Sequence, residues 1–199
     1  MSRLYVYKVR YDDGTAPCVE NGLLSLALCK PAIRSTAQVG DTLVGFAAKT
    51  MCADQRLVYA AVVTRKLDDG AYYRGTAGRN RRDCVYAWRN GTFQLRRDAV
   101  IAIGVDEMAN DLGEPPAYKH AQVLLSDNYR YFAETRPADY RAAYPALARM
   151  IDQLGQGHRV HHGDRVRDDI ERYLAHLWGS SRSTRVAWPR QSPPARHKP

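Results

Sequence analysis

The chain has 199 residues, of which 45% are hydrophobic, so it is long enough to bury a core, and one domain is the expected organisation. Lys and Arg number 30 against 21 Asp and Glu, a net charge of +9, and no apolar run approaches the roughly 20 residues of a membrane-spanning helix. This composition excludes a helical membrane protein, and because the N-terminus has a strand pattern instead of a secretory signal, we expect a cytoplasmic protein.

Much of the excess positive charge lies at the C-terminus. From Gly179 to Pro199 there are five Lys or Arg and no acid, which leaves 25 basic against 21 acidic residues, or +4, in the rest of the chain. The segment is also rich in Ser and Pro, a composition that does not bury enough surface to fold. We therefore predict a single domain over residues 1–178 and a basic disordered tail over 179–199. Such a tail either holds nucleic acid nonspecifically or only keeps the protein in solution.

Strand patterns dominate the first half of the chain, and one short helix interrupts them. Alternation and β-branched or aromatic residues mark the strands, and Gly, Pro and Asp mark the turns. In chain order we predict a strand at Leu4–Val9, a turn at Asp12-Asp13-Gly14, a short helix within residues 28–38 that begins near Pro31 and ends at Gly40-Asp41, and strands over residues 42–47 and 57–64.

The second half contains turns between short strands and then becomes helical. Residues 69–83 form a basic loop, Asn90-Gly91 predicts a hairpin, and Ser126-Asp127-Asn128 predicts a tight turn that closes a second hairpin. Two helices are predicted over residues 145–154 and 164–177, the latter with Ile170, Tyr173 and Leu177 on a buried face. Strands first and helices later predict an α+β fold with a mostly antiparallel, partly closed barrel and C-terminal helices.

The segment from Cys29 to Lys49 carries the best candidates for binding. Cys29 next to Lys30 has the pattern of a nucleophile with a lowered pKa, although a cysteine that ends an apolar run is more often buried. Lys30 and Arg34 share a helix face and, with Lys49, form a candidate phosphate cradle; the alternative is a solvated basic face. Asp41 either hydrogen-bonds a base edge or caps its own turn.

A second group of candidates follows residue 125. Ser126, Asp127 and Tyr129 place a hydroxyl, a carboxylate and an aromatic ring where a flipped base is read, while as a plain turn the segment needs no ligand. His158, in the loop GQGHR, is a candidate base or phosphate ligand.

The sequence lacks the motifs that mark several classes of functional site. The spacing HxxHH lacks the carboxylate and helical context of a zinc protease, and no two of the four cysteines form a CxxC, so we predict neither a metal site nor a disulfide framework. P-loop, dinucleotide-binding and nucleophile-elbow motifs are also absent from the sequence, and it indicates no particular cofactor.

An ordered series of motifs spans residues 4 to 160. It consists of Tyr5-x-Tyr7, Tyr11-Asp12-x-Gly14-x-Ala16-Pro17, Leu26-Ala27-x-Cys29-Lys30-Pro31-x-Ile33-Arg34, Val39-Gly40-Asp41, Leu57-x-Tyr59-Ala60, Tyr72-Tyr73, Leu125-Ser126-Asp127-x-Tyr129-x-Tyr131-Phe132 and Gly155-x-Gly157-His158. This series resembles the nucleotide modification associated domains of the second type, which occur in bacteria and phages beside genes for DNA base hypermodification. The chain departs from the usual pattern of these domains at Thr42, where an aromatic is common, and at residues 45–48, where a Gly-Thr-Gly-Ser-like segment is common.

The resemblance implies a role around modified bases without naming a reaction. A weaker similarity, to PUA-like barrels such as EVE domains, implies a pocket for a modified base.

The first hypothesis is a module that binds nucleotides or nucleic acid and recognises a base in a basic, aromatic-lined pocket, acting beside base-modifying enzymes in hypermodification or phage defence. The alternatives are an enzyme acting on a base or nucleotide through Cys29, Asp127 or His158, and a fold kept for protein–protein contact. We expect Arg34 and Asp127 to border one cavity.

Overall fold

The computed structural model describes residues 2–101, 103–133, 137 and 139–180. Within this part the chain forms two compact units. The first consists of the chain before Asp12, of Gln38–Thr64 and of the described residues from Ser126 onward; the second consists of Asp12–Ala37 and Arg65–Leu125. That residues 1–178 behave as one domain stays a prediction, and the predicted basic tail lies, except for its first two residues, outside the described residues.

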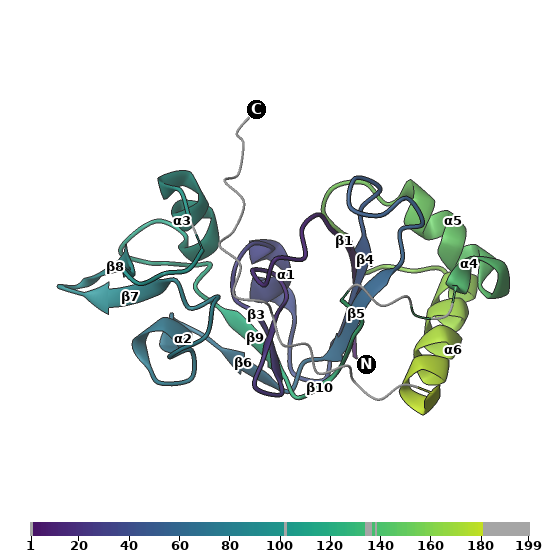
Figure 1. Ribbon diagram of the computed structural model, residues 1–199, viewed down its shortest axis with the longest axis horizontal. Coiled ribbons are helices and arrows are strands. Elements are labelled where there is room, and N and C mark those ends of the chain that lie inside the picture. The colour runs from purple at the N-terminus through teal and green to yellow at the C-terminus, as the bar shows by residue number, and fades with distance from the viewer. Residues whose placement is uncertain (1, 102, 134–136, 138, 181–199) are drawn as a thin grey trace. The chain divides into compact units, whose positions relative to one another are not determined.

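The first unit is a five-stranded sheet with helices on one face (Figure 1). Its strand order is β10-β5-β4-β1-β11, in which β1 and β4 run parallel and all other neighbours antiparallel. The strands are β1 (Leu4–Val9), β4 (Thr42–Ala47), β5 (Leu57–Val62), β10 (Asn128–Tyr131) and β11 (His158–Arg159), and the helices are α4 (Tyr140–Ala143), α5 (Pro145–Gln153) and α6 (Asp164–Ser180).

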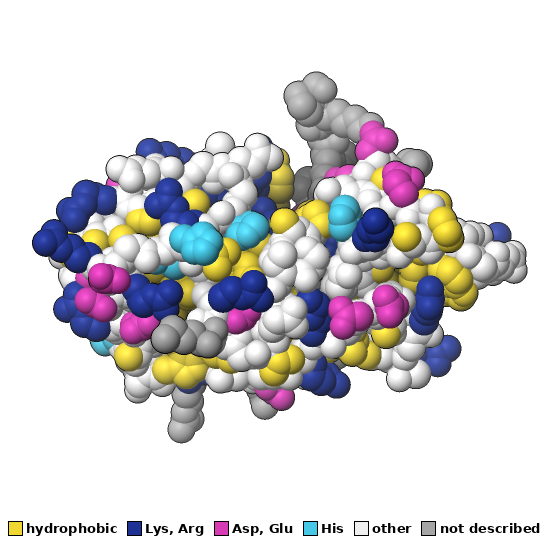
Figure 2. Space-filling view, turned by 180° about the vertical axis from the view of Figure 1, so that it is seen from behind, with side chains coloured by type: hydrophobic (Ala, Val, Ile, Leu, Met, Phe, Trp, Pro, Cys, Tyr) yellow, Lys and Arg dark blue, Asp and Glu magenta, His cyan; other side chains and the backbone are white. Residues whose placement is uncertain are grey.

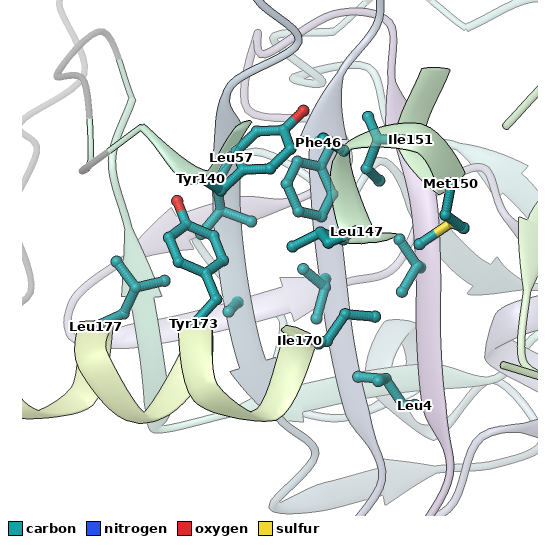
Figure 3. Close-up of a cluster of buried hydrophobic side chains, with 14 of the residues drawn as sticks. Leu4, Phe46, Leu57, Tyr140, Leu147, Met150, Ile151, Ile170, Tyr173 and Leu177 are labelled. Carbon is teal, nitrogen blue, oxygen red and sulfur yellow. The ribbon is translucent and has the colours of Figure 1, made fainter. Parts of the chain in front are cut away.

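The core of the first unit lies between the sheet and its helices. Strand alternation sends Leu4 and Val6 of β1 toward the helices, where they meet apolar residues of α5 and α6 (Figure 3). Ile170, Tyr173 and Leu177 of α6 are each about 1% exposed, which confirms the predicted buried face of this helix. Pro145 occupies the first turn of α5, as predicted, because its missing N–H has no acceptor there in any case.

The second unit contains a four-stranded sheet, a separate hairpin and three helices. Its sheet has the order β2-β3-β9-β6, and its core is rich in aromatic rings. The sheet strands are β2 (Cys18–Glu20), β3 (Leu23–Leu26), β6 (Arg65–Leu67) and β9 (Val123–Ser126), the hairpin strands are β7 (Tyr86–Arg89) and β8 (Thr92–Leu95), and the helices are α1 (Pro31–Thr36), α2 (Ala71–Arg74) and α3 (Val105–Leu112).

The α+β class, the mostly antiparallel pairing and the C-terminal helices are confirmed, but the predicted barrel is wrong for the described residues, where each sheet stays open. The predicted hairpin around Ser126-Asp127-Asn128 is also wrong. β9 pairs with β6 in the second unit, whereas β10 pairs with β5 in the first. Turn residues predict that the chain reverses direction locally. They do not determine whether the two strands that flank the turn pair with each other or with other strands. In the described chain no helix has the length and apolarity to cross a membrane.

Candidate functional site

A pocket of about 440 Å³ opens in the second unit. It lies among the end of α2, the loop that follows, the β7–β8 hairpin and the segment after β8. Its size is within the range of small-molecule sites. The lining residues are Tyr73, Arg74, Gly75, Thr76, Arg79, Cys84, Tyr86, Ala87, Trp88, Arg89, Arg96 and Asp98.

Two local features place the hairpin and α2 beside each other. Asn90 and Gly91 have φ values of 50° and 80°, the left-handed conformation that a two-residue hairpin turn requires. Gly70, with φ of 69°, precedes α2, and a Cβ there would overlap the ring of Phe93 in β8. Glycine at position 70 therefore lets the start of α2 approach the hairpin.

Buried aromatic side chains line the inner part of the pocket. Tyr73 and Tyr86 are 5% and 0% exposed, and their rings meet edge to face with centroids 5.3 Å apart. The Tyr73 hydroxyl donates to the Ala27 carbonyl at 2.8 Å, and the Tyr86 hydroxyl donates to the Asp111 carboxylate at 3.0 Å. Because both hydroxyl protons are bonded within the protein, these side chains offer a ligand mainly carbon surface.

Four arginines surround the aromatic part of the pocket. Arg74 lies over the Trp88 ring at 3.9 Å from its centroid, in a cation–π contact. Arg96 forms a two-pronged ion pair with Asp98, with distances of 3.0 and 2.7 Å. Within the described chain, Arg74, Arg79 and Arg89 form no ion pair. The pocket therefore carries an excess of positive charge next to exposed aromatic surface, an arrangement suited to an anion with a planar ring.

Cys84 also lines the pocket, but it is not an activated nucleophile. Burial raises the pKa of its thiol above the ordinary value, while the nearby Arg96 guanidinium acts in the opposite direction. The thiol lies 4.0 Å from the Tyr86 carbonyl, to which it donates. A raised pKa keeps the thiol protonated at neutral pH, and the protonated form is a poor nucleophile.

A buried polar network holds the loop that carries Arg79. Arg81 donates to the carbonyls of Glu20, Cys18 and Leu23 and to the Ser25 hydroxyl. The Asp83 carboxylate accepts from Ser25 at 2.5 Å and from Tyr72 at 2.7 Å. Burial raises the pKa of Asp83, and Arg81 and the two hydroxyl donors counteract this rise. The network fixes the loop from within, and Arg79 of the same loop lines the pocket.

Among the candidates near α1, Arg34 has a structural role in the second unit. Arg34 is 0% exposed, and its guanidinium donates to the carbonyls of Cys29, His120, Gln122 and Asp111. It does not line the pocket. Cys29 is partly exposed and donates its backbone N–H to the Asp111 carboxylate at 2.5 Å. Lys30 precedes α1 in a left-handed conformation and is also partly exposed.

The remaining candidates belong to the first unit. Asp41 is buried and accepts from the backbone N–H groups of Arg3 and Gln38, which is the turn-capping role that was the alternative for this residue. Lys49 is exposed, and Ser126 is buried, with its hydroxyl bonded to the main chain of Asn128. Tyr129 is 8% exposed and lies on β10.

The structure does not bring Asp127 and His158 together. Asp127 is exposed and directly precedes β10, at one edge of the five-stranded sheet, while His158 lies on β11 at the other edge. Neighbouring strands are about 4.8 Å apart, so the width of the sheet separates the two side chains. His158 instead lies beside Tyr5, with ring centroids 5.7 Å apart.

The segments that form the pocket were recognisable in the sequence, but their proximity in the fold was not predicted. The basic loop, the Tyr72-Tyr73 pair and the Asn-Gly hairpin were each recognised, but none of their residues was named among the candidate site residues. The available signal was the repeated neighbourhood of aromatic and arginine residues in Tyr72-Tyr73-Arg74 and Trp88-Arg89. On the face drawn in Figure 2, basic and acidic side chains are interspersed and do not merge into one basic surface. The concentration of arginine around aromatic rings distinguishes the pocket.

These observations define an α+β protein with a basic pocket lined by aromatic side chains. The family model of nucleotide modification associated domain 2 matches residues 1–192, and the chain belongs to this family. The family resemblance found in the sequence is thereby confirmed, and with it an association with nucleotide modification. No curated protein and no solved structure matches the chain.

Proposed function

We propose that the protein binds a nucleotide, free or within a nucleic acid, in the pocket of the second unit, and that this binding serves nucleotide modification. The observation that carries the proposal is a set of three arginines, Arg74, Arg79 and Arg89, around an aromatic-lined pocket, none of which forms an ion pair with another described residue. Guanidinium groups bind phosphate oxygens through paired hydrogen bonds, and aromatic rings stack on bases. Family membership supports the same ligand class.

The proposal moves the binding site away from the segment around Lys30 and Arg34. An arginine that donates to four carbonyls inside the protein has few donors left for a phosphate. The pocket arginines, in contrast, are exposed at Arg74, Arg79 and Arg89. Entry of a modified base into this pocket and cooperation with base-modifying enzymes are further parts of the proposal that the family association supports.

The experiment is a titration of the full chain with labelled single-stranded DNA, double-stranded DNA and deoxynucleoside monophosphates at two salt concentrations. Binding should weaken as salt rises, because phosphate contacts release counterions. The double variant Arg79→Ala, Arg89→Ala should lose at least tenfold in affinity, since a hydrogen bond to a charged group contributes about 1.5–3 kcal/mol. Arg149→Ala removes an exposed arginine from α5 in the first unit and serves as the matched control. Equal affinities of the double variant and the control would overturn the proposal.

A further inference from the structure

The pocket offers many groups for a phosphate and few for the edge of a base. Base identity is read by hydrogen bonds to base edges, whereas phosphate contacts and stacking carry little information about the base. The two tyrosine hydroxyls that line the pocket donate to Ala27 and Asp111 instead. The Cys84 thiol donates to the Tyr86 carbonyl, and the Asp98 carboxylate is held by Arg96.

Apart from the exposed Thr76 hydroxyl, the side chains that remain are suited to the phosphate and to the plane of the base. Arg79 and Arg89 are exposed and form no ion pair among the described residues, so their donors are available to an anion. Trp88 is 37% exposed, the largest exposed fraction among the aromatic lining residues. Phe93 packs against its ring at an interplanar angle of 72°, with centroids 4.7 Å apart, and the Arg74 guanidinium lies over the ring. A base that takes the place of this guanidinium would stack on the indole.

We propose that the pocket takes a single nucleotide unit, binds it by its phosphate and by stacking on Trp88, and accepts all four bases with similar affinity. This inference rests on the proposed function and specifies the ligand class of the same site. The volume of about 440 Å³ suits one nucleotide and is too small for a duplex. Tolerance of the base edge would let bases with altered edges enter the same pocket.

The test is calorimetric titration of the full chain with the four deoxynucleoside monophosphates, with deoxyadenosine and with inorganic phosphate. The four monophosphates should bind within about threefold of one another, and deoxyadenosine should bind at least tenfold more weakly than its monophosphate. Trp88→Ala should weaken monophosphate binding fivefold or more and weaken inorganic phosphate binding by a clearly smaller factor, and Trp88→Phe should restore most of the loss. Trp178→Phe, in α6 of the first unit, is the matched control.

Different results would overturn different claims. A preference of more than tenfold for one base, or equal binding of deoxyadenosine and its monophosphate, contradicts the inference while leaving nucleotide binding in place. Failure of every monophosphate and every oligonucleotide to bind contradicts the proposed function itself. A short single strand with a 5′-phosphate and the same strand without it distinguish a terminal nucleotide from an internal one as the source of the ligand, since only the terminal phosphate carries two negative charges.

Discussion

Arg34 and Asp111 contact each other inside the second unit: the guanidinium donates to the Asp111 main-chain carbonyl at 2.8 Å and lies 3.5 Å from its carboxylate. The same carboxylate accepts from the Tyr86 hydroxyl at 3.0 Å, and Tyr86 lines the pocket. Burial raises the pKa of Asp111, and Arg34 counteracts this rise. Arg34 therefore supports the position of an aromatic side chain of the pocket from within the core.

Arg34→Lys should strongly destabilise the protein. Lysine keeps the charge, but its single ammonium cannot reach the four carbonyls that the planar guanidinium contacts. A buried carbonyl that is left without a hydrogen-bond donor costs about 1–3 kcal/mol. Chemical unfolding should show at least this loss in the free energy of unfolding. Arg149→Lys, at an exposed position of α5, should leave the free energy of unfolding unchanged. If Arg34 instead binds phosphate directly, the variant will unfold like the native protein and lose nucleotide affinity.

Asp98→Asn should tighten the binding of nucleotides. In the free protein the exposed Asp98 carboxylate occupies Arg96, so it competes with a phosphate for that guanidinium. Exposed ion pairs contribute about 0–1 kcal/mol, so removing the carboxylate should increase affinity by up to about fivefold with little change in stability. Asp68→Asn makes the same charge change at an exposed site of the second unit that does not line the pocket. Equal gains in both variants would point to overall charge instead of competition at Arg96.

Gly45→Ala should destabilise the first unit. A Cβ at this position in β4 would lie 2.5 Å from a ring carbon of Tyr59 and 2.8 Å from a methyl carbon of Val9. Overpacking of this kind typically costs about 1–3 kcal/mol, which thermal unfolding will detect. Gly155 is exposed, with no heavy atom within 4 Å of its Cβ position, so Gly155→Ala should change the stability by no more than about 1 kcal/mol. Similar melting temperatures for both variants would show that the sheet adapts.

The contribution of Lys8 to the free energy of unfolding should increase as the pH rises above about 8. Burial lowers the pKa of this lysine to about 8, Asp152 partly opposes the shift, and Arg141 and Lys49 add to it. Its ammonium donates to Gln55 at 2.5 Å. Between pH 8 and the ordinary pKa of 10.5, the unfolded state binds more protons than the folded state, so the free energy of unfolding contributed by this group rises with pH.

Lys8→Met is the variant that isolates this effect. Its free energy of unfolding, measured by urea at pH 7.5 and 9.5, should rise less over this interval than that of the native protein. Other titrating groups are common to both proteins, so the difference between the two slopes reports Lys8. A difference of zero would mean that Lys8 keeps its ordinary pKa in the folded protein.

Local patterns in the sequence determined most of the secondary structure. The strands at Leu4–Val9 and Thr42–Ala47, the short helix after Lys30 and the buried face of α6 were all predicted, because periodicity and turn residues act over a few neighbouring positions. The α+β class followed from the same patterns, whereas the family resemblance rested on the ordered series of motifs and is confirmed by the family model. The four-residue helix α2 was missed, because Ala71–Arg74 is too short for a helical period to be visible.

The tertiary structure alone decided how the strands pair and which arginines are available to a ligand. β9 and β10 adjoin in sequence yet pair in different sheets, because sheet pairing depends on distant strands. Arg34 and Arg89 are both arginines near turns, but Arg34 is buried by carbonyls that lie 77 to 88 residues away, at Asp111, His120 and Gln122, whereas Arg89 is exposed on a hairpin. Burial depends on such long-range contacts, so the sequence identified an arginine-rich, aromatic-rich protein, and the fold selected which of these residues form the pocket.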